Sequence, residues 1–279
     1  MIDLHTHSTV SDGSDPPAQI VALAAAADCR AVALTDHDRL DGVPEARAEA
    51  ARRGLELVAG CELSCVWGPG TFHLLVYFLE PGLGPLQEHL TTLQGQRDER
   101  NHRLVARLQE LGLPITFEEV EAEAGGAGIG RPHVAAVLVR KGVVASVAEA
   151  FDRWLAKGKP GYVRKATLEP GEAIDLALAS GAVPVLAHPH SLGLEPGGLG
   201  PTLRELSERG LAGVECHYGA YQPEERAGLT ALAGRLGLVA TGGSDYHGRY
   251  KPDLSVGTGR GDLEVPDAVI DSLRERRAA

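Results

Sequence analysis

The sequence predicts an α/β fold, a distorted seven-stranded (β/α)7 barrel that carries a helical insertion. Seven short apolar runs predict buried strands, and most of them lack alternation, which is typical of strands covered on both faces. Helical patterns that end at a glycine lie between most of these runs, as expected of repeated β–α units. Between about residues 90 and 168 this alternation stops, and the pattern is helical throughout.

The barrel elements follow one another in order along the chain. The helix expected over Pro16–Ala27 comes after the capping candidates Ser14 and Asp15, and the helix expected over Gly42–Arg53 is followed by Gly54, a suitable C-cap. The other expected barrel helices are Glu172–Ala179, Thr202–Arg209 and Pro223–Leu236. The expected strands are Ile2–His5, Ala31–Thr35, Glu56–Gly60, Phe72–Phe78, Val183–Ala187, Gly213–Cys216 and Leu238–Thr241.

The helical stretch predicts an insertion between the fourth and fifth strands. We expect residues 1–90 and 168–279 to form the barrel, and residues 91–167 to form an insertion that serves as a substrate lobe. Residues 90–170 carry 12 Lys and Arg against 10 Asp and Glu, whereas the rest of the chain carries 15 against 28. A basic lobe on an acidic body suits an anionic substrate. The helices expected in the insertion are Gln94–Leu111, Phe117–Ala124, Arg131–Lys141 and Val147–Ala156.

Four arginines of the insertion, Arg97, Arg100, Arg103 and Arg107, recur at spacings of three and four. This spacing places them on one stripe of a helix. Taken alone, the stripe is best explained as a solvated helix face.

The composition excludes several classes of protein. The chain has 27 Lys and Arg against 38 Asp and Glu, a net charge of −11, so long duplex nucleic acid and anionic membranes would repel it. No apolar run approaches the roughly 20 residues of a membrane span, and the first expected strand begins at Ile2, which leaves no room for a signal peptide. The four cysteines are too few and too scattered for a disulfide scaffold. We therefore expect a cytoplasmic protein without membrane association.

Histidines and carboxylates gather where the expected strands end. His5 and His7 close the first strand, and a spacing of two places both imidazoles on one strand face. His73 begins its strand instead, but the turn-forming segment Val66–Thr71 predicts a hairpin that brings it beside Glu62. Strand ends of this kind meet at the end of an α/β fold that holds the active site. The nine candidate metal ligands are His5, His7, Asp12, His37, Glu62, His73, His188, Asp245 and His247.

The nine candidate ligands together predict a metal centre more strongly than any one of these residues does alone. A lone His-x-His pair, or a lone histidine at a strand end, is more simply explained as structural. Burying so many ionisable groups together is costly unless metal ions compensate them. Imidazoles and carboxylates without cysteine suit Zn, Mn or Fe in an open catalytic site. Cys61 and Cys65 are expected in the core, because Cys61 should point away from its neighbour Glu62 on the strand.

The charge of the expected centre predicts its reaction. Three divalent ions would outweigh the negative charges of Asp12, Glu62 and Asp245, so the site would stay positive and attract a phosphate. Several ions together clamp phosphate oxygens and lower the pKa of bound water. We therefore expect a phosphoester to be hydrolysed by a metal-bound hydroxide.

The motifs resemble those of the PHP phosphoesterase family, in order and over nearly the whole chain. The resemblance implies a seven-stranded, distorted barrel that holds a trinuclear metal site. The motifs are Asp3-Leu4-His5-Thr6-His7, Ser11-Asp12-Gly13, Thr35-Asp36-His37-Asp38, Gly60-Cys61-Glu62, His73-Leu74-Leu75, Ala187-His188-Pro189 and Gly243-Ser244-Asp245-Tyr246-His247.

The resemblance also implies how the ligands divide among three divalent ions per chain, which would be Mn, Fe or Zn. Many relatives have His where this chain has Asp12, and a carboxylate is the harder ligand, which favours Mn over Zn. The implied first ion takes His5, His7, Glu62 and Asp245, the second takes Asp12, His37 and His247, and the third takes Glu62, His73 and His188.

The helical insertion and its Gly130-Arg131-Pro132-His133 motif resemble the TrpH-like group of the family. That group includes nucleoside 3',5'-bisphosphate phosphatases and the 5'-to-3' exonuclease ribonuclease AM. The resemblance implies that Arg131 clamps the substrate phosphate, with His133 beside it. Alternatively, both residues simply begin a helix. His190 and His217 are further histidines at strand ends, each of which could contact substrate, protonate the leaving group or orient a neighbour.

We expect the enzyme to remove the 3'-phosphate from nucleoside 3',5'-bisphosphates, to cleave short RNA from its 5' end, or both. Its partner would then be a small anionic nucleotide or a short oligoribonucleotide. Histidinol-phosphate phosphatase is a second candidate activity, against which the Gly130–His133 motif argues. An amidohydrolase-type deaminase would need a metal-bridging Lys at a strand end, where this sequence has none. A catalytically silent metal-binding module is disfavoured because the ligand set is intact.

Overall fold

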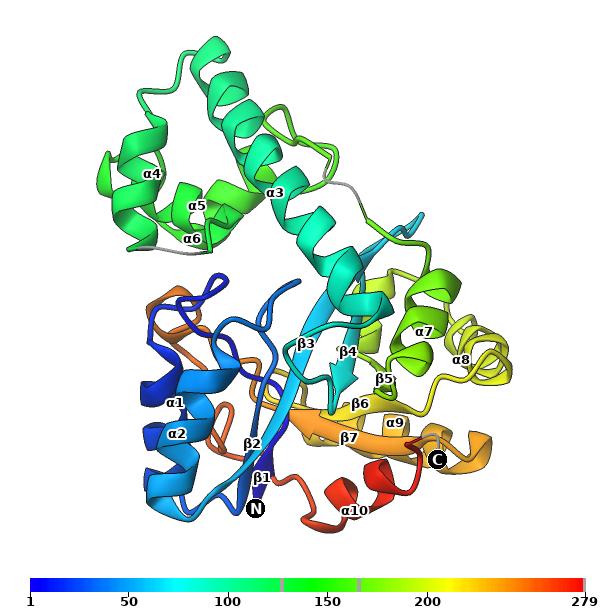
Figure 1. The fold of residues 1–279 in the computed structure, drawn as a ribbon. Coiled ribbons are helices and arrows are strands. Elements are labelled where there is room, and N and C mark those ends of the chain that lie inside the picture. The colour runs from blue at the N-terminus through cyan, green and yellow to red at the C-terminus, as the bar shows by residue number, and fades with distance from the viewer. Residues whose placement is uncertain (126–127, 165–166, 278–279) are drawn as a thin grey trace.

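The computed structural model describes residues 1–125, 128–164 and 167–277 (Figure 1). Seven strands form one sheet in which the spatial order follows the chain from β1 to β7. The α/β barrel predicted from the sequence is therefore confirmed. The strands are β1 (Ile2–Asp3), β2 (Ala31–Leu34), β3 (Glu56–Cys65), β4 (Phe72–Tyr77), β5 (Val183–Leu186), β6 (Gly213–Tyr218) and β7 (Val239–Gly243).

One strand runs against the others. β4 pairs antiparallel with both β3 and β5, whereas the remaining neighbours pair in parallel. The predicted hairpin between β3 and β4 is confirmed, and β3 extends to Cys65 rather than Gly60 because it pairs with β4 over six positions. The two edges of the sheet also meet, since the Leu4 N–H donates to the Gly242 carbonyl (3.1 Å). The result is a nearly closed, distorted barrel.

Helices cover the outside of this barrel and extend from it (Figure 1). The C-terminal helix α10 was not expected from the sequence, and the helix after β4 begins at Pro85 rather than Gln94. Proline fits the first turn of a helix, where its missing N–H leaves no bond unmade. The helices are α1 (Pro17–Ala26), α2 (Val43–Arg53), α3 (Pro85–Glu110), α4 (Phe117–Ala124), α5 (Arg131–Arg140), α6 (Val147–Ala150), α7 (Pro170–Ala179), α8 (Leu199–Glu208), α9 (Pro223–Leu236) and α10 (Ala268–Arg274).

The described residues also form three short helical segments of other types. The π-helix η1 (Phe151–Leu155) continues α6, so the single helix expected over Val147–Ala156 is split into two types. The 3₁₀ turns η2 (Pro189–Leu192) and η3 (Gly248–Tyr250) follow β5 and β7.

The apolar core is divided between the barrel and the end of α3 that lies away from it. Ile2, Val58 and Val185 pack in one cluster with Ile270 of α10. A separate cluster joins the second half of α3 to α4, α5, α6 and η1, and Figure 1 shows this group beyond the barrel. Of the described helices, none is both long enough and apolar enough to cross a membrane.

Candidate metal centre

The nine residues predicted as ligands come together at one end of the barrel. His5 and His7 follow β1 and are fully buried, and Glu62 of β3 is 1% exposed. His37 follows β2 and forms a bridge with Glu62 at the same level. Three groups of these side chains have donor atoms within 4.8 Å of one another, which is close enough to share an ion.

The first group surrounds the two histidines that follow β1. The Nε2 atoms of His5 and His7 lie 3.1 Å apart. Asp245 Oδ1 lies 3.5 Å from His5 Nε2 and 3.4 Å from His7 Nε2, and Glu62 Oε2 lies 3.4 and 3.2 Å from the same two atoms. Donors that each sit about 2.1 Å from a tetrahedral ion are separated by about 3.4 Å. This group therefore fits one divalent cation.

The second group surrounds Asp12. Its Oδ1 lies 3.4 Å from His247 Nε2, and its Oδ2 lies 3.7 Å from His37 Nε2. The Nδ1 atom of His7 lies 3.8 Å from Asp12 Oδ1 and is buried without a hydrogen-bond partner among the described residues. A buried imidazole nitrogen without a partner costs stability unless a bound group satisfies it. The unpartnered Nδ1 atom of His7 therefore supports a cation beside Asp12.

The third group consists of His37, Glu62 and His73, and the other oxygen of Glu62 extends it to His188. Glu62 Oε1 lies 2.8 Å from His73 Nδ1 and 3.0 Å from His188 Nε2. His73 reaches Glu62 because the hairpin places it opposite Ser64, two residues further along the same face of β3. One carboxylate therefore faces two ligand groups, with one oxygen toward each.

The electrostatics of these residues favour bound cations. Burial lowers the pKa of His7, but the Asp245 and Glu62 carboxylates more than offset this effect and raise it to about 9. Burial raises the pKa of Glu62, but His73, His37 and His5 hold it well below its usual value. The carboxylates thus stay ionised at neutral pH and attract positive charge, which protons supply when no metal is bound.

Two further carboxylates hold the predicted ligands in place. Glu215 of β6 is fully buried and accepts hydrogen bonds from His5 Nδ1 (2.9 Å) and from the His188 backbone N–H (2.7 Å). Asp36 accepts bonds from the Ser8 backbone and from the Ser8 and Ser11 hydroxyls. A carboxylate placed like Glu215 fixes the orientation of metal-binding histidines, whereas Asp36 holds the loop between His7 and Asp12. The position of Glu215 at a strand end was a signal, but the sequence did not indicate its role.

Tyr218 and Lys251 also reach the centre, and sequence reasoning missed both. The Tyr218 hydroxyl donates to Asp245 Oδ2 (2.7 Å), and the Lys251 ammonium group contacts the same oxygen. Asp245 therefore turns Oδ1 toward the histidines and Oδ2 toward these two donors. Lys251 lies four residues beyond the last ligand in the chain, outside every motif, so only the path of the loop brings it back.

The two residues predicted to bind substrate lie at the start of α5. Arg131 donates to the Leu155 carbonyl (3.2 Å), and its guanidinium lies over the rings of Phe151 (5.6 Å) and Tyr162 (6.0 Å). His133 is buried, and its Nδ1 accepts the Gly130 backbone N–H (3.0 Å), which caps the helix. Burial lowers the pKa of His133 to about 4, so this histidine is neutral.

The structure does not bring His190 or His217 into contact with the nine ligands. His190 is exposed, and its Nδ1 lies 3.3 Å from Glu225 Oε1. Its ring packs on the ring of Tyr221, with 4.6 Å between the two centroids. Tyr221 in turn packs on Tyr218 (4.7 Å). Burial, with the Arg226 guanidinium of α9 adding to it, lowers the pKa of His217.

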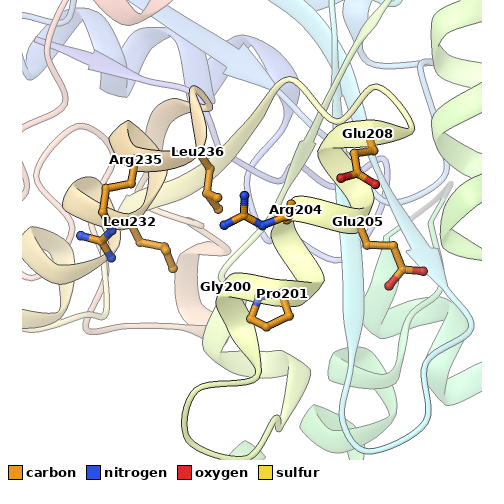
Figure 2. A pocket seen from close by; sticks show the side chains of 8 residues that line it. All are labelled: Gly200, Pro201, Arg204, Glu205, Glu208, Leu232, Arg235 and Leu236. Carbon is orange, nitrogen blue, oxygen red and sulfur yellow. The ribbon is translucent and has the colours of Figure 1, made fainter.

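A groove of about 660 Å³ lies between α8 and α9, on the outside of the barrel (Figure 2). Apolar Leu232 and Leu236 face charged residues such as Arg204 and Glu208 across it. Its described lining contains no histidine, cysteine or predicted site residue, so the groove lies apart from the buried histidine and carboxylate cluster.

An α/β barrel that buries imidazoles and carboxylates around one shared glutamate is the arrangement of a metal-dependent hydrolase. Comparisons with known proteins define the family. The PHP domain model matches residues 3–119. A 3',5'-nucleoside bisphosphate phosphatase from Chromobacterium violaceum is 32% identical, over 92% of this chain and 90% of its own length. The 5'-3' exoribonuclease Rnm of Escherichia coli is 33% identical, over 88% of this chain and 84% of its own.

A solved structure agrees with these relatives. A protein from Bifidobacterium adolescentis, described as a metal-dependent phosphoesterase, superposes with a TM-score of 0.88 at 29% identity and covers 100% of this chain and 96% of its own. The chain belongs to the PHP family, and it is a metal-dependent phosphoesterase.

Proposed function

We propose that this enzyme acts on nucleotides, removing the 3'-phosphate of nucleoside 3',5'-bisphosphates, cleaving short RNA from its 5' end, or both. The observation that carries the proposal is the division of Glu62 between two histidine groups, which joins all nine ligands into one centre. The bisphosphate phosphatase and the exoribonuclease among the relatives support the substrate class, because each aligns with most of this chain.

We further propose that the centre holds three divalent ions, with manganese favoured by the carboxylate of Asp12. His5, His7 and Asp245 would hold the first together with Glu62 Oε2. Glu62 Oε1, His73 and His188 would hold the third. The second would lie among Asp12, His37 and His247. When bound, such ions polarise phosphate oxygens and acidify a water molecule.

The protein's own residues position the reacting groups. Glu215 holds the His5 ring through Nδ1, so that Nε2 faces the centre. Tyr218 and Lys251 fix Asp245 through its outer oxygen. Lys251 also adds a positive charge beside the ligands, where it would attract the phosphate of an incoming substrate. Each of these contacts reduces the reorganisation that the reaction needs.

The insertion, residues 91–167, would act as the substrate lobe. Arg131 is the residue that we assign to a substrate phosphate, since a guanidinium binds phosphate through two parallel hydrogen bonds. His133 would support it by capping α5 rather than by contacting the substrate. The net charge of −11 disfavours a long duplex but permits a mononucleotide or a short single strand.

Of the two remaining histidines, we assign a substrate contact to His190. It is exposed, and Tyr221 and Tyr218 connect it to the ligand His188 through successive ring contacts. His217 faces the charge of Arg226 and is assigned a structural part. The substrate's leaving group would then meet the rings of Tyr218 and Tyr221, with the His190 imidazole at their outer end.

The test is phosphate release from adenosine 3',5'-bisphosphate, measured in manganese beside stepwise shortening of a 5'-phosphorylated RNA oligomer of a few nucleotides. We expect turnover of at least one substrate, loss of turnover in His5→Ala, and a lower rate in Arg131→Ala. Arg103→Ala is the matched control, because Arg103 is exposed on the same insertion. Turnover of neither substrate by metal-loaded protein would contradict the proposal and leave histidinol phosphate as the next substrate to assay.

A further inference from the structure

The arginine stripe of α3 is only partly a solvated face, contrary to the hypothesis that the sequence favoured. Arg103 and Arg107 are exposed, but Arg97 is 8% exposed and Arg100 only 4%. Arg97 Nη1 donates to the carbonyl of the predicted ligand His37 (3.3 Å). Part of the stripe therefore ties the insertion to the loop that follows β2, which is one of the loops that carry predicted ligands.

Glu123 forms a second tie, which reaches the loop that follows β7. It lies near the end of α4, and its side chain is 11% exposed. Arg249 Nη2 donates to Glu123 Oε1 (2.7 Å), and the Tyr250 hydroxyl donates to the same oxygen (3.3 Å). The other oxygen of Glu123 contacts the Arg140 guanidinium of α5. Hydrogen bonds between ionised partners are among the stronger contacts in proteins. Glu123 therefore joins two helices of the insertion to η3 of the barrel.

Tyr250 is enclosed by this contact, although it belongs to the barrel. It is 8% exposed, and its ring packs edge-on against the ring of His133 at the start of α5 (5.3 Å between centroids). Arg249 Nη2 donates to the Tyr250 hydroxyl (3.0 Å), and its guanidinium lies over the Tyr250 ring (5.1 Å). The hydroxyl thus accepts from Arg249 and donates to Glu123. We call the contacts among Glu123, Arg249 and Tyr250 the latch.

The latch lies next to the metal centre along the chain. η3 directly follows the predicted ligand His247, and it directly precedes Lys251, whose ammonium group contacts Asp245 Oδ2. On its barrel side, η3 is held by Ser14, whose hydroxyl accepts the Arg249 backbone N–H (3.0 Å). A displacement of η3 would therefore move Lys251 away from the outer oxygen of Asp245.

The seam between the insertion and η3 is held by polar contacts. A cavity of about 330 Å³ lies beside the latch, and Val139 and Val147 of the insertion contribute to its lining. The insertion and the barrel also have separate apolar clusters. Parts of a chain that meet without a large shared apolar core are expected to move relative to one another. The contacts of Glu123 therefore hold α4 against η3 at this seam.

We propose that Glu123 is a positioning residue that couples the docking of the insertion to the alignment of Asp245 in the metal centre. With the latch formed, η3 is fixed between Ser14 and Glu123, and Lys251 is held against Asp245. Without it, Lys251 loses the support of the insertion. Coupling between two sites is reciprocal, so an ion held by Asp245 strengthens the latch in turn. This inference rests on the proposed metal centre.

The first test measures hydrogen exchange in the full-length protein, metal-free and manganese-loaded. In the wild type, we expect manganese to slow the exchange of the α4 amides by about fivefold or more. Glu123→Gln should lose most of this effect, whereas β3, which carries Glu62, should still be slowed. Glu121→Gln is the matched control, because Glu121 is exposed on the same helix, and it should behave as the wild type.

The two strands of the result separate the latch from the metal centre. Slowing in β3 without slowing in α4, or equal slowing of α4 in Glu123→Gln, would overturn the coupling. If manganese slowed exchange in neither element, the proposed metal centre would fail, and the stability of the metal-free protein would then decide the latch. Glu123→Gln and Arg249→Gln should together destabilise the protein by less than the sum of their separate effects. Additive losses would overturn the latch.

Kinetics give a second readout, which a purely structural role would not produce. With adenosine 3',5'-bisphosphate as substrate, Glu123→Gln should lower kcat/KM by about twofold to thirtyfold. Because Glu123 acts through Lys251, the same change should lower kcat/KM no further when it is made in Lys251→Met. An equal loss in both backgrounds would indicate a general loss of structure and contradict the positioning role. Wild-type kcat/KM in Glu123→Gln would contradict it as well.

Discussion

At the scale of a single residue, Glu62 joins the two histidine groups of the proposed metal centre. Its two carboxylate oxygens face different histidine groups. Because Glu62 is buried, no solvent can hydrogen-bond to these oxygens. Glu215 acts one layer further out, where it accepts from both a ligand ring and the backbone of His188. The His188 backbone has φ of +23°, an uncommon value for a residue other than glycine. The hydrogen bond that the His188 N–H donates to Glu215 helps to hold that conformation.

Glu215→Gln tests this positioning role. The amide keeps the shape of the side chain but removes the charge that orients His5, so we expect metal affinity to fall by about tenfold to a hundredfold. The measurement is a manganese titration of the chelator-treated protein, compared with Glu205→Gln on the exposed face of α8. Manganese affinity equal to the wild type would mean that Glu215 does not position the ligand.

Single residues differ in how far the sequence could predict them. Because His5 and His7 are two residues apart, their side chains lie on the same face of an extended chain. The turn before His73 sets the pairing of the hairpin, and this pairing places His73 near Glu62. Both could be read from local pattern. The contact of Lys251 with Asp245 could not, because it depends on the path of a loop, which no local period encodes.

At the scale of elements, the loop that leads into α5 joins the insertion to the barrel. A methyl group on Gly128 would lie 2.0 Å from the Val10 carbonyl oxygen, far inside contact distance. Val10 precedes the predicted ligand Asp12 by two residues. The insertion therefore packs against the ligand loop itself, which explains how a helical lobe could influence the chemistry.

Gly128→Ala should separate the loop that leads into α5 from the loop that carries Val10 and Asp12. Because the clash is with backbone, we expect a loss of about 1–3 kcal/mol in the free energy of unfolding and a lower kcat/KM on the bisphosphate. Gly95→Ala is the control, since a methyl group there meets nothing within 4 Å in the middle of α3. It should stabilise the protein by about 0.5–1 kcal/mol. Chemical denaturation measures the free energy of unfolding of both variants. Equal stability of the two variants would refute this account of the loop.

Element boundaries were harder to predict than element types. The hydrophobic pattern located the seven strands, because each contains a short apolar run that is mostly buried. It missed α10, whose apolar residues pack with the barrel core and look from the sequence like an irregular tail. It also started α3 late, although Leu86, Leu90 and Leu93 recur at helical spacing and form the buried face of its first turns.

At the scale of the whole molecule, the ligands connect segments that are far apart in the chain. Residues near positions 5, 62, 188 and 245 all meet at the centre, so bound ions would link both ends of the chain to its middle. Without ions, the same place buries several carboxylates held together with protonated histidines. Metal binding and folding should therefore be coupled.

Chelation tests this coupling. An ion at a hundred times its dissociation constant stabilises the folded state by about 2.7 kcal/mol, and for a chain of this size each kcal/mol moves the Tm by about 2–4 °C. We therefore expect removal of the metals to lower the Tm by several degrees and manganese to restore it. An unchanged Tm after verified metal removal would show that the centre contributes nothing to the fold.

The most direct test of the account is to add manganese back to metal-free enzyme while following phosphate release from adenosine 3',5'-bisphosphate. A centre of three ions joined by Glu62 predicts that the rate keeps rising until about three equivalents per chain are bound. Glu62→Gln should bind fewer ions and show almost no turnover. Full activity at one equivalent, or undiminished activity in Glu62→Gln, would contradict the shared centre.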